Sequence, residues 1–154
     1  MRREAGFLAT YASPLGGLRI TGRGEGISAI SIISGKSLTG KLPFSVRRRL
    51  DIYFKGSAKT GGGRFLLEGT PFQRNVWKAL LSIPWGESVS YTELARRVKR
   101  PQAVRAVANA VGKNPVAILI PCHRVIGSDG ALTGYAYGLK KKKWLLLHEK
   151  KRRG

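Results

Sequence analysis

The chain has 154 residues, with 29 Lys or Arg against 8 Asp or Glu, which gives a formal net charge of +21. An apolar fraction of 42% is ordinary and predicts a folded protein of one domain or two small ones, so the positive charge is the unusual feature. A single cysteine excludes an internal disulfide, and two histidines provide no cluster for a structural zinc site, so we expect no metal.

The positive charge leaves three explanations open: a nucleic acid partner, an anionic membrane surface, or a basic surface kept only for solubility. Residues 71–154 carry 17 basic and 4 acidic side chains and are the better candidate for binding a polyanion. The longest apolar run, VAILI at 116–120, is too short to span a bilayer, and the N-terminus lacks an apolar stretch of signal-peptide length. We therefore expect a soluble, cytoplasmic protein without a membrane partner.

The first part of the chain is predicted to contain strands followed by one helix. Over residues 6–33 apolar and polar residues alternate between the turn-forming clusters SPLGG and GRGEG, which predicts two or three antiparallel strands. Residues 45–54 place Val46, Leu50 and Phe54 four residues apart, which predicts an amphipathic helix.

Glycines at 61–63 mark a flexible connection, where we expect a domain boundary between residues 1–63 and residues 64–154. Beyond it, Thr70 and Pro71 have the residue types of a helix cap and a first helical position.

Two further short helices suggest a helix-turn-helix. Ser90 and Glu93 are spaced as a capping box for a helix running through Val98, and a second helix is expected over residues 101–111. A tight turn between two short helices is a weak signal for DNA binding, because any small helical bundle offers it. The residues expected to face outward on the second helix are Gln102, Arg105 and Asn109.

The last part of the chain leads up to the only cysteine and then to a final helix. Residues 114–121, NPVAILIP, are predicted to form a buried extended segment that delivers Cys122 to a fixed place. Residues 127–138 form a glycine-rich loop, and a helix over residues 139–151 is expected to place residues 144–147 in the core.

Cys122 lies between Pro121 and His123, and it can be a small buried hydrophobe, a metal ligand or a nucleophile. Free cysteine is among the most buried residue types and often only fills space. Reactivity requires the thiolate, which cationic or proton-accepting groups favour, and His123, Arg124 and Glu149 could supply such groups. A histidine can take the thiol proton while a carboxylate holds the imidazole in the required tautomer. The residues alone leave both the hydrophobe and the nucleophile open.

The second part of the chain resembles the O6-alkylguanine-DNA alkyltransferases, which repair DNA by direct reversal. The similar segments are TPFQRNVWKALLSIPWGESVSYTELA, RAVANAVGKNPVAILIPCHRVIG, GYAYG and KKWLLLHE. The first part resembles the family's N-terminal domain only in length and strand pattern. The resemblance implies an α+β fold, with a ribonuclease-H-like α/β N-terminal domain and a mostly helical C-terminal domain that contains a winged-helix-like helix-turn-helix.

The resemblance also implies roles for the residues around the cysteine. Cys122 would accept the alkyl group irreversibly, His123 would act as its base through a water, and Glu149 would orient the histidine. Asn114 would brace the site, and Tyr91 would rotate the target phosphate and donate to N3 of guanine. No cofactor is implied, because the damaged DNA itself supplies the alkyl group.

The implied partner is duplex DNA that contains O6-alkylguanine, bound by a monomer. An alkyl group on O6 lies inside the duplex, so the nucleotide must be flipped out, and Arg105 would fill the gap. Ala106 and Ala110 would let the helix lie close in the minor groove. The residues expected to contact DNA are Arg105, Tyr91, Ala106, Asn109, Gln102 and Arg124.

In the guanine pocket, the resemblance implies that the carbonyls of Cys122 and Val125 accept the exocyclic amine and that the N–H of Ala136 meets O6. Tyr137 replaces a smaller residue of some relatives and would narrow the pocket. Tyr135 and Lys142 would flank it.

Three alternatives stay open at this point. An alkyltransferase-like protein binds damage without repairing it, but its cysteine is typically replaced. In a helix-turn-helix regulator, Cys122 and His123 would have no functional role. A thiol hydrolase is weakly supported, because a Cys-His pair alone is common in proteins.

Overall fold

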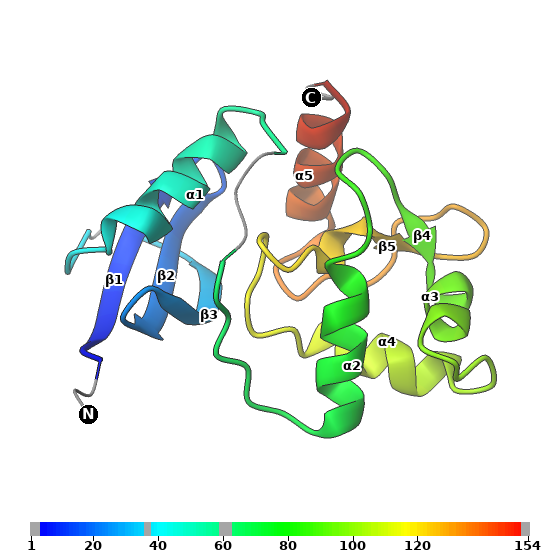
Figure 1. The fold of residues 1–154 in the computed structure, drawn as a ribbon. Helices are drawn as coiled ribbons and strands as arrows, with labels where there is room; N and C mark the ends of the chain where they lie inside the picture. The colour runs from blue at the N-terminus through cyan, green and yellow to red at the C-terminus, as the bar shows by residue number, and fades with distance from the viewer. Residues whose placement is uncertain (1–3, 36–37, 59–62, 152–154) are drawn as a thin grey trace. The chain divides into compact units, whose positions relative to one another are not determined.

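The computed structural model describes residues 4–35, 38–58 and 63–151 (Figure 1). These ranges form a mixed α+β structure with one antiparallel sheet, one short parallel strand pair and five α-helices, so the predicted fold class is confirmed. The glycines at 61–62 and the last residues of the basic tail, 152–154, lie outside the described residues. None of the described helices combines the length and the apolar character that crossing a membrane requires.

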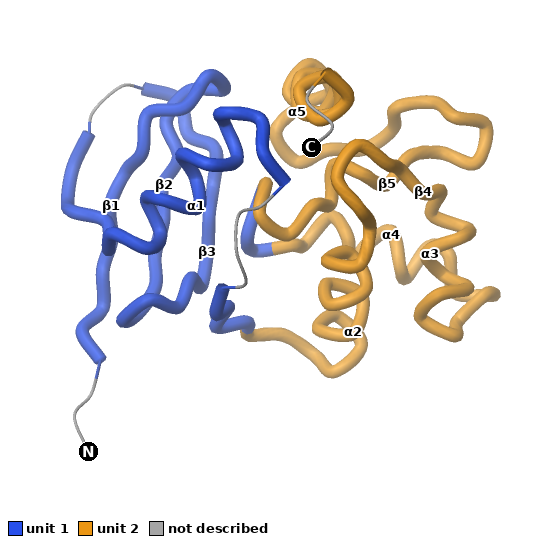
Figure 2. Tube along the Cα trace, turned by 45° about the horizontal axis from the view of Figure 1, so that its top comes forward, with its two compact units in different colours: residues 1–67, 115–117, 154 blue, residues 68–114, 118–153 orange. Residues whose placement is uncertain are grey.

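Contacts divide the chain into two compact units (Figure 2). The first unit runs to Leu67 and also takes in Pro115–Ala117 from much later in the chain. The second unit comprises Glu68–Asn114 and the chain from Ile118 onward. The boundary after residue 63 stays a prediction, and the sequence does not anticipate the return of the chain into the first unit.

The sheet of the first unit is an antiparallel meander whose buried face is aliphatic. Its three strands lie within the alternating pattern of residues 6–33, and a register shift between Thr21 and Gly22 interrupts the pairing of the second strand with the third. The fully buried side chains on this face include Leu18, Ile20, Ile27 and Ile30. The strands are β1 (Gly6–Ser13), β2 (Gly16–Arg23) and β3 (Gly26–Ile33).

Helix α1 (Phe44–Phe54) packs through Val46 and Leu50, as predicted, but its third inward residue is Tyr53. Phe54 is only half-buried and stacks on Tyr11, with ring centroids 6.0 Å apart. An α-helix has 3.6 residues per turn, so a stripe that continues in steps of four residues drifts off the buried face. The third buried position is therefore Tyr53, one residue before Phe54.

The outer edge of β3 is covered by two short segments from elsewhere in the chain. Ile27 exchanges backbone hydrogen bonds of 2.9 and 2.8 Å with residues 64 and 66. Ile30 exchanges hydrogen bonds of 2.9 and 3.1 Å with residues 115 and 117. An uncovered edge strand is a template for unwanted pairing, so these bridges close it. The second bridge also anchors the chain shortly before it reaches Cys122.

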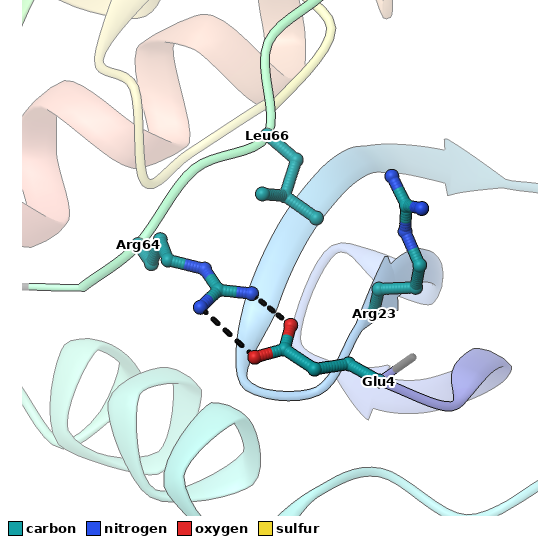
Figure 3. A pocket seen from close by; sticks show the side chains of 4 residues that line it. All are labelled: Glu4, Arg23, Arg64 and Leu66. Carbon is teal, nitrogen blue, oxygen red and sulfur yellow. Dashed lines mark hydrogen bonds and ion pairs between the residues drawn. The ribbon is translucent and has the colours of Figure 1, made fainter. Parts of the chain in front are cut away.

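A hollow of about 410 Å³ in the first unit is lined by Glu4, Arg23, Arg64 and Leu66 (Figure 3). The Arg64 guanidinium forms a bidentate ion pair with the Glu4 carboxylate. Both side chains are about half exposed, and ion pairs of that kind contribute little to stability. We therefore assign this hollow no function.

The second unit is built around helix α2, which begins as the sequence predicts. The Thr70 hydroxyl accepts a hydrogen bond from the Gln73 N–H, and the Gln73 side chain accepts one from the Thr70 N–H. Trp77 is buried, and its indole N–H donates to the Ala110 carbonyl at 2.8 Å. The elements of the unit are α2 (Pro71–Leu80), β4 (Val89–Ser90), α3 (Tyr91–Arg97), α4 (Val104–Gly112), β5 (Val125–Ile126) and α5 (Leu139–Lys151).

The two helices of the predicted helix-turn-helix are present, with two corrections. The Ser90 hydroxyl accepts from the Glu93 N–H as expected, but the Glu93 carboxylate pairs with Arg96 and Arg97 instead of completing a capping box. Helix α4 begins at Val104 rather than residue 101, because residues 101–102 form a turn and Ala103 is the N-cap.

Helix α5 differs from the prediction in which face it buries. Leu145 is fully buried, but Leu147 is 45% exposed. Lys142 and Glu149 are fully buried on the face that contains Leu145, at spacings of three and four residues. The sequence suggested an apolar core face, and the structure instead places two charged side chains there.

The capping box of α2 provides a test of local stability. Thr70→Ala should lower the free energy of unfolding by about 1 kcal/mol, because the Gln73 N–H loses its acceptor. Thr70→Ser keeps the hydroxyl and should retain nearly the full free energy of unfolding. Urea unfolding followed by Trp fluorescence measures both, and equal midpoints for the two variants would contradict the capping role.

Candidate active site

Cys122 lines a cavity of about 170 Å³ within the second unit. The cavity lies where the N-terminus of α3, the C-terminus of α4 and the glycine-rich loop before α5 meet. Besides Cys122, its lining includes five residues predicted for the site: Tyr91, Asn114, Tyr135, Ala136 and Tyr137. The residues that the sequence did not single out are Val111, Gly112 and Gly134.

Cys122 begins a short 3-10 helix (Cys122–Arg124), which follows a tight turn. The predicted extended segment before it is buried, but only Val116 pairs as a strand, and residues 117–119 turn. Ile118 has φ +74, an uncommon backbone conformation for a β-branched residue. The Asn114 side-chain amide and the Cys122 N–H both donate to the Ile120 carbonyl at 2.8 Å. This carbonyl therefore joins the end of α4 to the cysteine, which supports the bracing role predicted for Asn114.

His123, Arg124 and Glu149 form a buried hydrogen-bonded group. His123 Nε2 lies 2.6 Å from one oxygen of the Glu149 carboxylate, and Arg124 Nε donates to the other at 2.7 Å. Arg124 also donates to the Ile83 carbonyl at 2.6 Å. Burial by itself raises the pKa of Glu149, but the interactions with His123 and Arg124 outweigh it and lower that pKa to about 2. The carboxylate is therefore ionised and can only accept hydrogen bonds.

This arrangement selects one tautomer of His123. Because Glu149 can only accept, Nε2 must donate. Burial also holds the pKa of His123 below its ordinary value of 6.5, against the opposing effect of Glu149, so the imidazole is neutral at neutral pH. Nδ1 then carries the lone pair, and this buried atom has no hydrogen-bond partner in the described part of the chain. An unpaired basic nitrogen beside the cysteine in sequence is available to a water or a proton.

The thiol of Cys122 is in its neutral form at rest. Burial raises its pKa, although a hydrogen bond from the Asn114 side chain and the charge of Lys142 oppose the rise. A thiol with a raised pKa is a poor nucleophile until a base removes its proton. The site therefore contains a protonated thiol and, in the next residue, a neutral imidazole that can take up a proton.

Lys142 is fully buried, and its ammonium group donates to three carbonyls, those of Val125, Thr133 and Gly134, at 2.6, 2.8 and 3.2 Å. Three acceptors match the three N–H donors of the charged form. Lys142 and Val125 were both expected at the pocket, but neither is among the side chains that line the cavity. Lys142 instead ties the glycine-rich loop to β5.

The tyrosines give the cavity its aromatic walls. The rings of Tyr135 and Tyr137 meet edge to face, with centroids 5.6 Å apart. Burial raises the pKa of Tyr135 and of Tyr91, and the nearby Cys122 adds to both effects. Both phenols therefore stay protonated and can donate a hydrogen bond. The Tyr91 hydroxyl lies 3.4 Å from the Thr133 carbonyl, and the described residues give the Tyr135 hydroxyl no partner.

A family model described as "6-O-methylguanine DNA methyltransferase, DNA binding domain" matches residues 71–151. The methylated-DNA–protein-cysteine methyltransferase of Methanosarcina acetivorans is 41% identical over 150 residues, which cover 91% of this chain and 96% of the relative. The chain belongs to the methylated-DNA–protein-cysteine methyltransferase family.

Solved structures of this methyltransferase family share the whole fold. The O6-methylguanine methyltransferase of Mycobacterium tuberculosis has a TM-score of 0.87 at 38% identity, covering 97% of this chain and 96% of that one. The structure of the M. tuberculosis protein OGT in complex with DNA has a TM-score of 0.83 at 42% identity, covering 93% and 92%.

In this member of the family, α4 presents the residues that we expect to contact DNA on one exposed face. Arg105, Ala106 and Asn109 are at least partly exposed on the helix, and Gln102 is exposed in the turn before it. Ala110 is buried and its carbonyl accepts from Trp77, so the expectation that it faces the groove is wrong.

The prediction that Arg124 contacts DNA is also wrong. Its guanidinium is committed to Glu149 and to the Ile83 carbonyl, and the residue is only 9% exposed. Nothing in the sequence indicates Ile83, because a backbone acceptor has no residue signature. His, Cys, Asp and Glu side chains form no group of three that could hold a metal ion within residues 4–35, 38–58 and 63–151.

The buried carboxylate predicts acid sensitivity. The pKa of Glu149 is about 2 in the folded protein against an ordinary value of 4.5, so ionised Glu149 stabilises the folded protein above pH 4.5. This contribution is lost as the pH falls from 4.5 toward 2. Glu149→Gln should lower stability at neutral pH, because Arg124 loses its counter-charge, and should flatten the dependence on pH in this range.

Chemical unfolding at a series of pH values measures this effect. Glu87→Gln, at an exposed glutamate, is the matched control and should keep the pH dependence of the unchanged protein. Parallel curves for Glu149→Gln and the control would contradict the assignment.

Proposed function

We propose that this protein repairs O6-alkylguanine in duplex DNA by moving the alkyl group irreversibly to the sulfur of Cys122. The observation that carries the proposal is the cysteine lining a small aromatic cavity, followed directly by a histidine whose tautomer Glu149 fixes. Membership of the methyltransferase family supports the same reaction.

His123 has the properties that the proton-transfer step requires. Its neutral Nδ1 takes the thiol proton of Cys122 through a water, and Glu149 stabilises the imidazolium that forms. General-base catalysis of this kind contributes roughly 10²- to 10⁴-fold. The resting thiol stays protonated until substrate is bound, so the buried site does not hold an unpaired thiolate.

The transfer itself exchanges one bond for another. The sulfur attacks the alkyl carbon, a C–S bond forms, and the bond between that carbon and guanine O6 breaks. The electron pair of the broken bond stays with guanine, which takes up one proton in place of the alkyl group, so the proton that guanine gains balances the proton that the thiol loses. Tyr91 donates a hydrogen bond to N3 and the N–H of Ala136 donates to O6, so both stabilise the departing base. The thioether is not a nucleophile in this site, so each chain acts once.

Reaching O6 requires the nucleotide to leave the stack, at a cost of a few kcal/mol. In the proposal α4 lies in the minor groove, and exposed Arg105 enters the stack in place of the flipped nucleotide. The small side chain of Ala106 allows the helix to approach the groove closely. One chain meets one lesion, so the proposed acting form is a monomer, and the proposed compartment is the cytoplasm.

The decisive experiment is mass spectrometry after incubation with a duplex that contains O6-methylguanine. The protein should gain the mass of one methylene on the peptide that contains Cys122, in a stoichiometric reaction that restores guanine. Cys122→Ser should still bind this duplex but gain no mass. An unmodified protein with an intact lesion would refute the proposal.

The size of the cavity predicts selectivity among alkyl groups. Tyr137→Gly removes one of the two rings that meet edge to face and should speed transfer of a benzyl group by roughly 10-fold or more, because the cavity gains room. Tyr137→Phe keeps the ring and should react with O6-benzylguanine DNA as the unchanged protein does. Single-turnover rates with methylated and benzylated duplexes make the comparison, and an equal benzyl rate in all three proteins would show that Tyr137 does not limit the cavity.

A further inference from the structure

A basic hollow of about 740 Å³ lies in the second unit between α2 and the turn after α3. On α2, Pro71, Arg74, Asn75 and Lys78 share one exposed stripe at spacings of three and four residues, while Val76 and Trp77 face the core. From the turn come the exposed side chains of the two residues that follow Val98. The polar side chains of the hollow are Arg74, Asn75, Lys78, Lys99 and Arg100.

Lys99 occupies a backbone position that normally favours glycine. Its φ is +60, and it follows the C-cap of α3. The Lys99 N–H donates to the Arg96 carbonyl at 3.0 Å and the Arg100 N–H donates to the Ala95 carbonyl at 2.9 Å. This pair of bonds is the Schellman motif, in which the left-handed residue is usually glycine because a side chain there is strained. Position 99 therefore contains a lysine although glycine would be more stable in this backbone conformation.

The cations of the hollow are not neutralised locally. In the part of the chain that the structure describes, neither Arg74 nor Lys78 nor Lys99 forms an ion pair with a carboxylate. The nearest acidic residue in sequence to Lys99, Glu93, is paired with Arg96 and Arg97 instead. A concave surface with several unpaired cations raises the local concentration of anions.

We infer that the basic hollow binds the phosphate backbone of the DNA duplex outside the lesion, through Arg74, Lys78 and Lys99. The inference rests on the proposed function. Lys99 and Arg100 closely precede Gln102, which is exposed in the turn before α4, so the hollow adjoins residues that we expect to contact DNA. A backbone contact holds DNA in register without reading its sequence, and each neutralised phosphate adds to the salt dependence of binding.

Lys99→Gly separates binding from folding. Glycine adopts the left-handed conformation without strain, so the midpoint of thermal unfolding should stay the same or rise. Affinity for an undamaged duplex should fall severalfold, and the slope of log affinity against log salt should become shallower by about 0.9, because one phosphate is no longer neutralised. Arg74→Gln with Lys78→Gln should lower the slope by about twice that amount. Fluorescence anisotropy at a series of KCl concentrations measures each slope.

Lys55→Gln, at an exposed lysine of the first unit, removes the same charge away from the hollow and is the matched control. A Lys99→Gly slope equal to the control slope would overturn the inference. Replacing chloride by inorganic phosphate at matched ionic strength should leave the difference between these two variants in place. A difference that disappears would identify a free-phosphate site instead of a DNA contact.

Methyl transfer by the unchanged protein, measured in the same preparations, tests the proposed function separately. Salt slopes that differ in a protein that transfers no methyl group would refute the repair function while leaving the hollow as a DNA contact.

Discussion

The carboxylate of Glu149 is the group on which the rest of the site depends. It comes from α5, and its two oxygens bind His123 and Arg124 from the short helix that begins with Cys122. Arg124 reaches on to the Ile83 carbonyl in the loop after α2. Three separate parts of the second unit are thus held by one buried charge. Removing one partner of such a group typically costs about 3–5 kcal/mol, because the other charge is left uncompensated.

The same carboxylate explains why the site can be both buried and reactive. An ionised Glu149 holds the imidazole proton on Nε2, which leaves the basic Nδ1 of His123 free. Burial disfavours the charged forms of both the thiol and the imidazole, raising the pKa of Cys122 and lowering that of His123. The resting site therefore holds a neutral thiol and a neutral imidazole. In the reaction that we propose, charges separate only when the proton moves, and Glu149 and Lys142 then stabilise the ions.

The sequence predicted helices and strands correctly where the pattern of side chains in a short segment determines them. The strands of residues 6–33 and the cap at Thr70 follow from alternation and from a hydroxyl at the right spacing. The family resemblance around Cys122 predicted roles for His123, Asn114 and Glu149, but not that Arg124 is buried with His123 and Glu149 in one hydrogen-bonded group. Arg124 was among the residues expected to contact DNA, and only the distance to Glu149 shows its structural role.

The predictions failed where backbone conformation or contacts between distant parts of the chain determine the structure. Nothing in NPVAILIP indicates that Ile118 takes a left-handed conformation, or that residues 115 and 117 pair with Ile30 of β3. Pairing between residues so distant in sequence depends on an open sheet edge, which a single segment does not encode. The strain at Ile118 persists because the Ile30 bridge fixes the chain on one side and the Asn114 bond to the Ile120 carbonyl fixes it on the other.

At more than one point, a positively charged residue occupies a position where it lowers local stability. Lys99 takes a position that suits glycine, and the first turn of α5 contains Lys140 and Lys141 but no acidic residue, although the positive end of the helix dipole disfavours cations there. A basic surface that served only solubility would have no reason to occupy these positions, because many neutral surface sites would cost less. Retaining cations where the fold disfavours them is the pattern expected when a polyanionic partner, and not folding, decides where the charge lies.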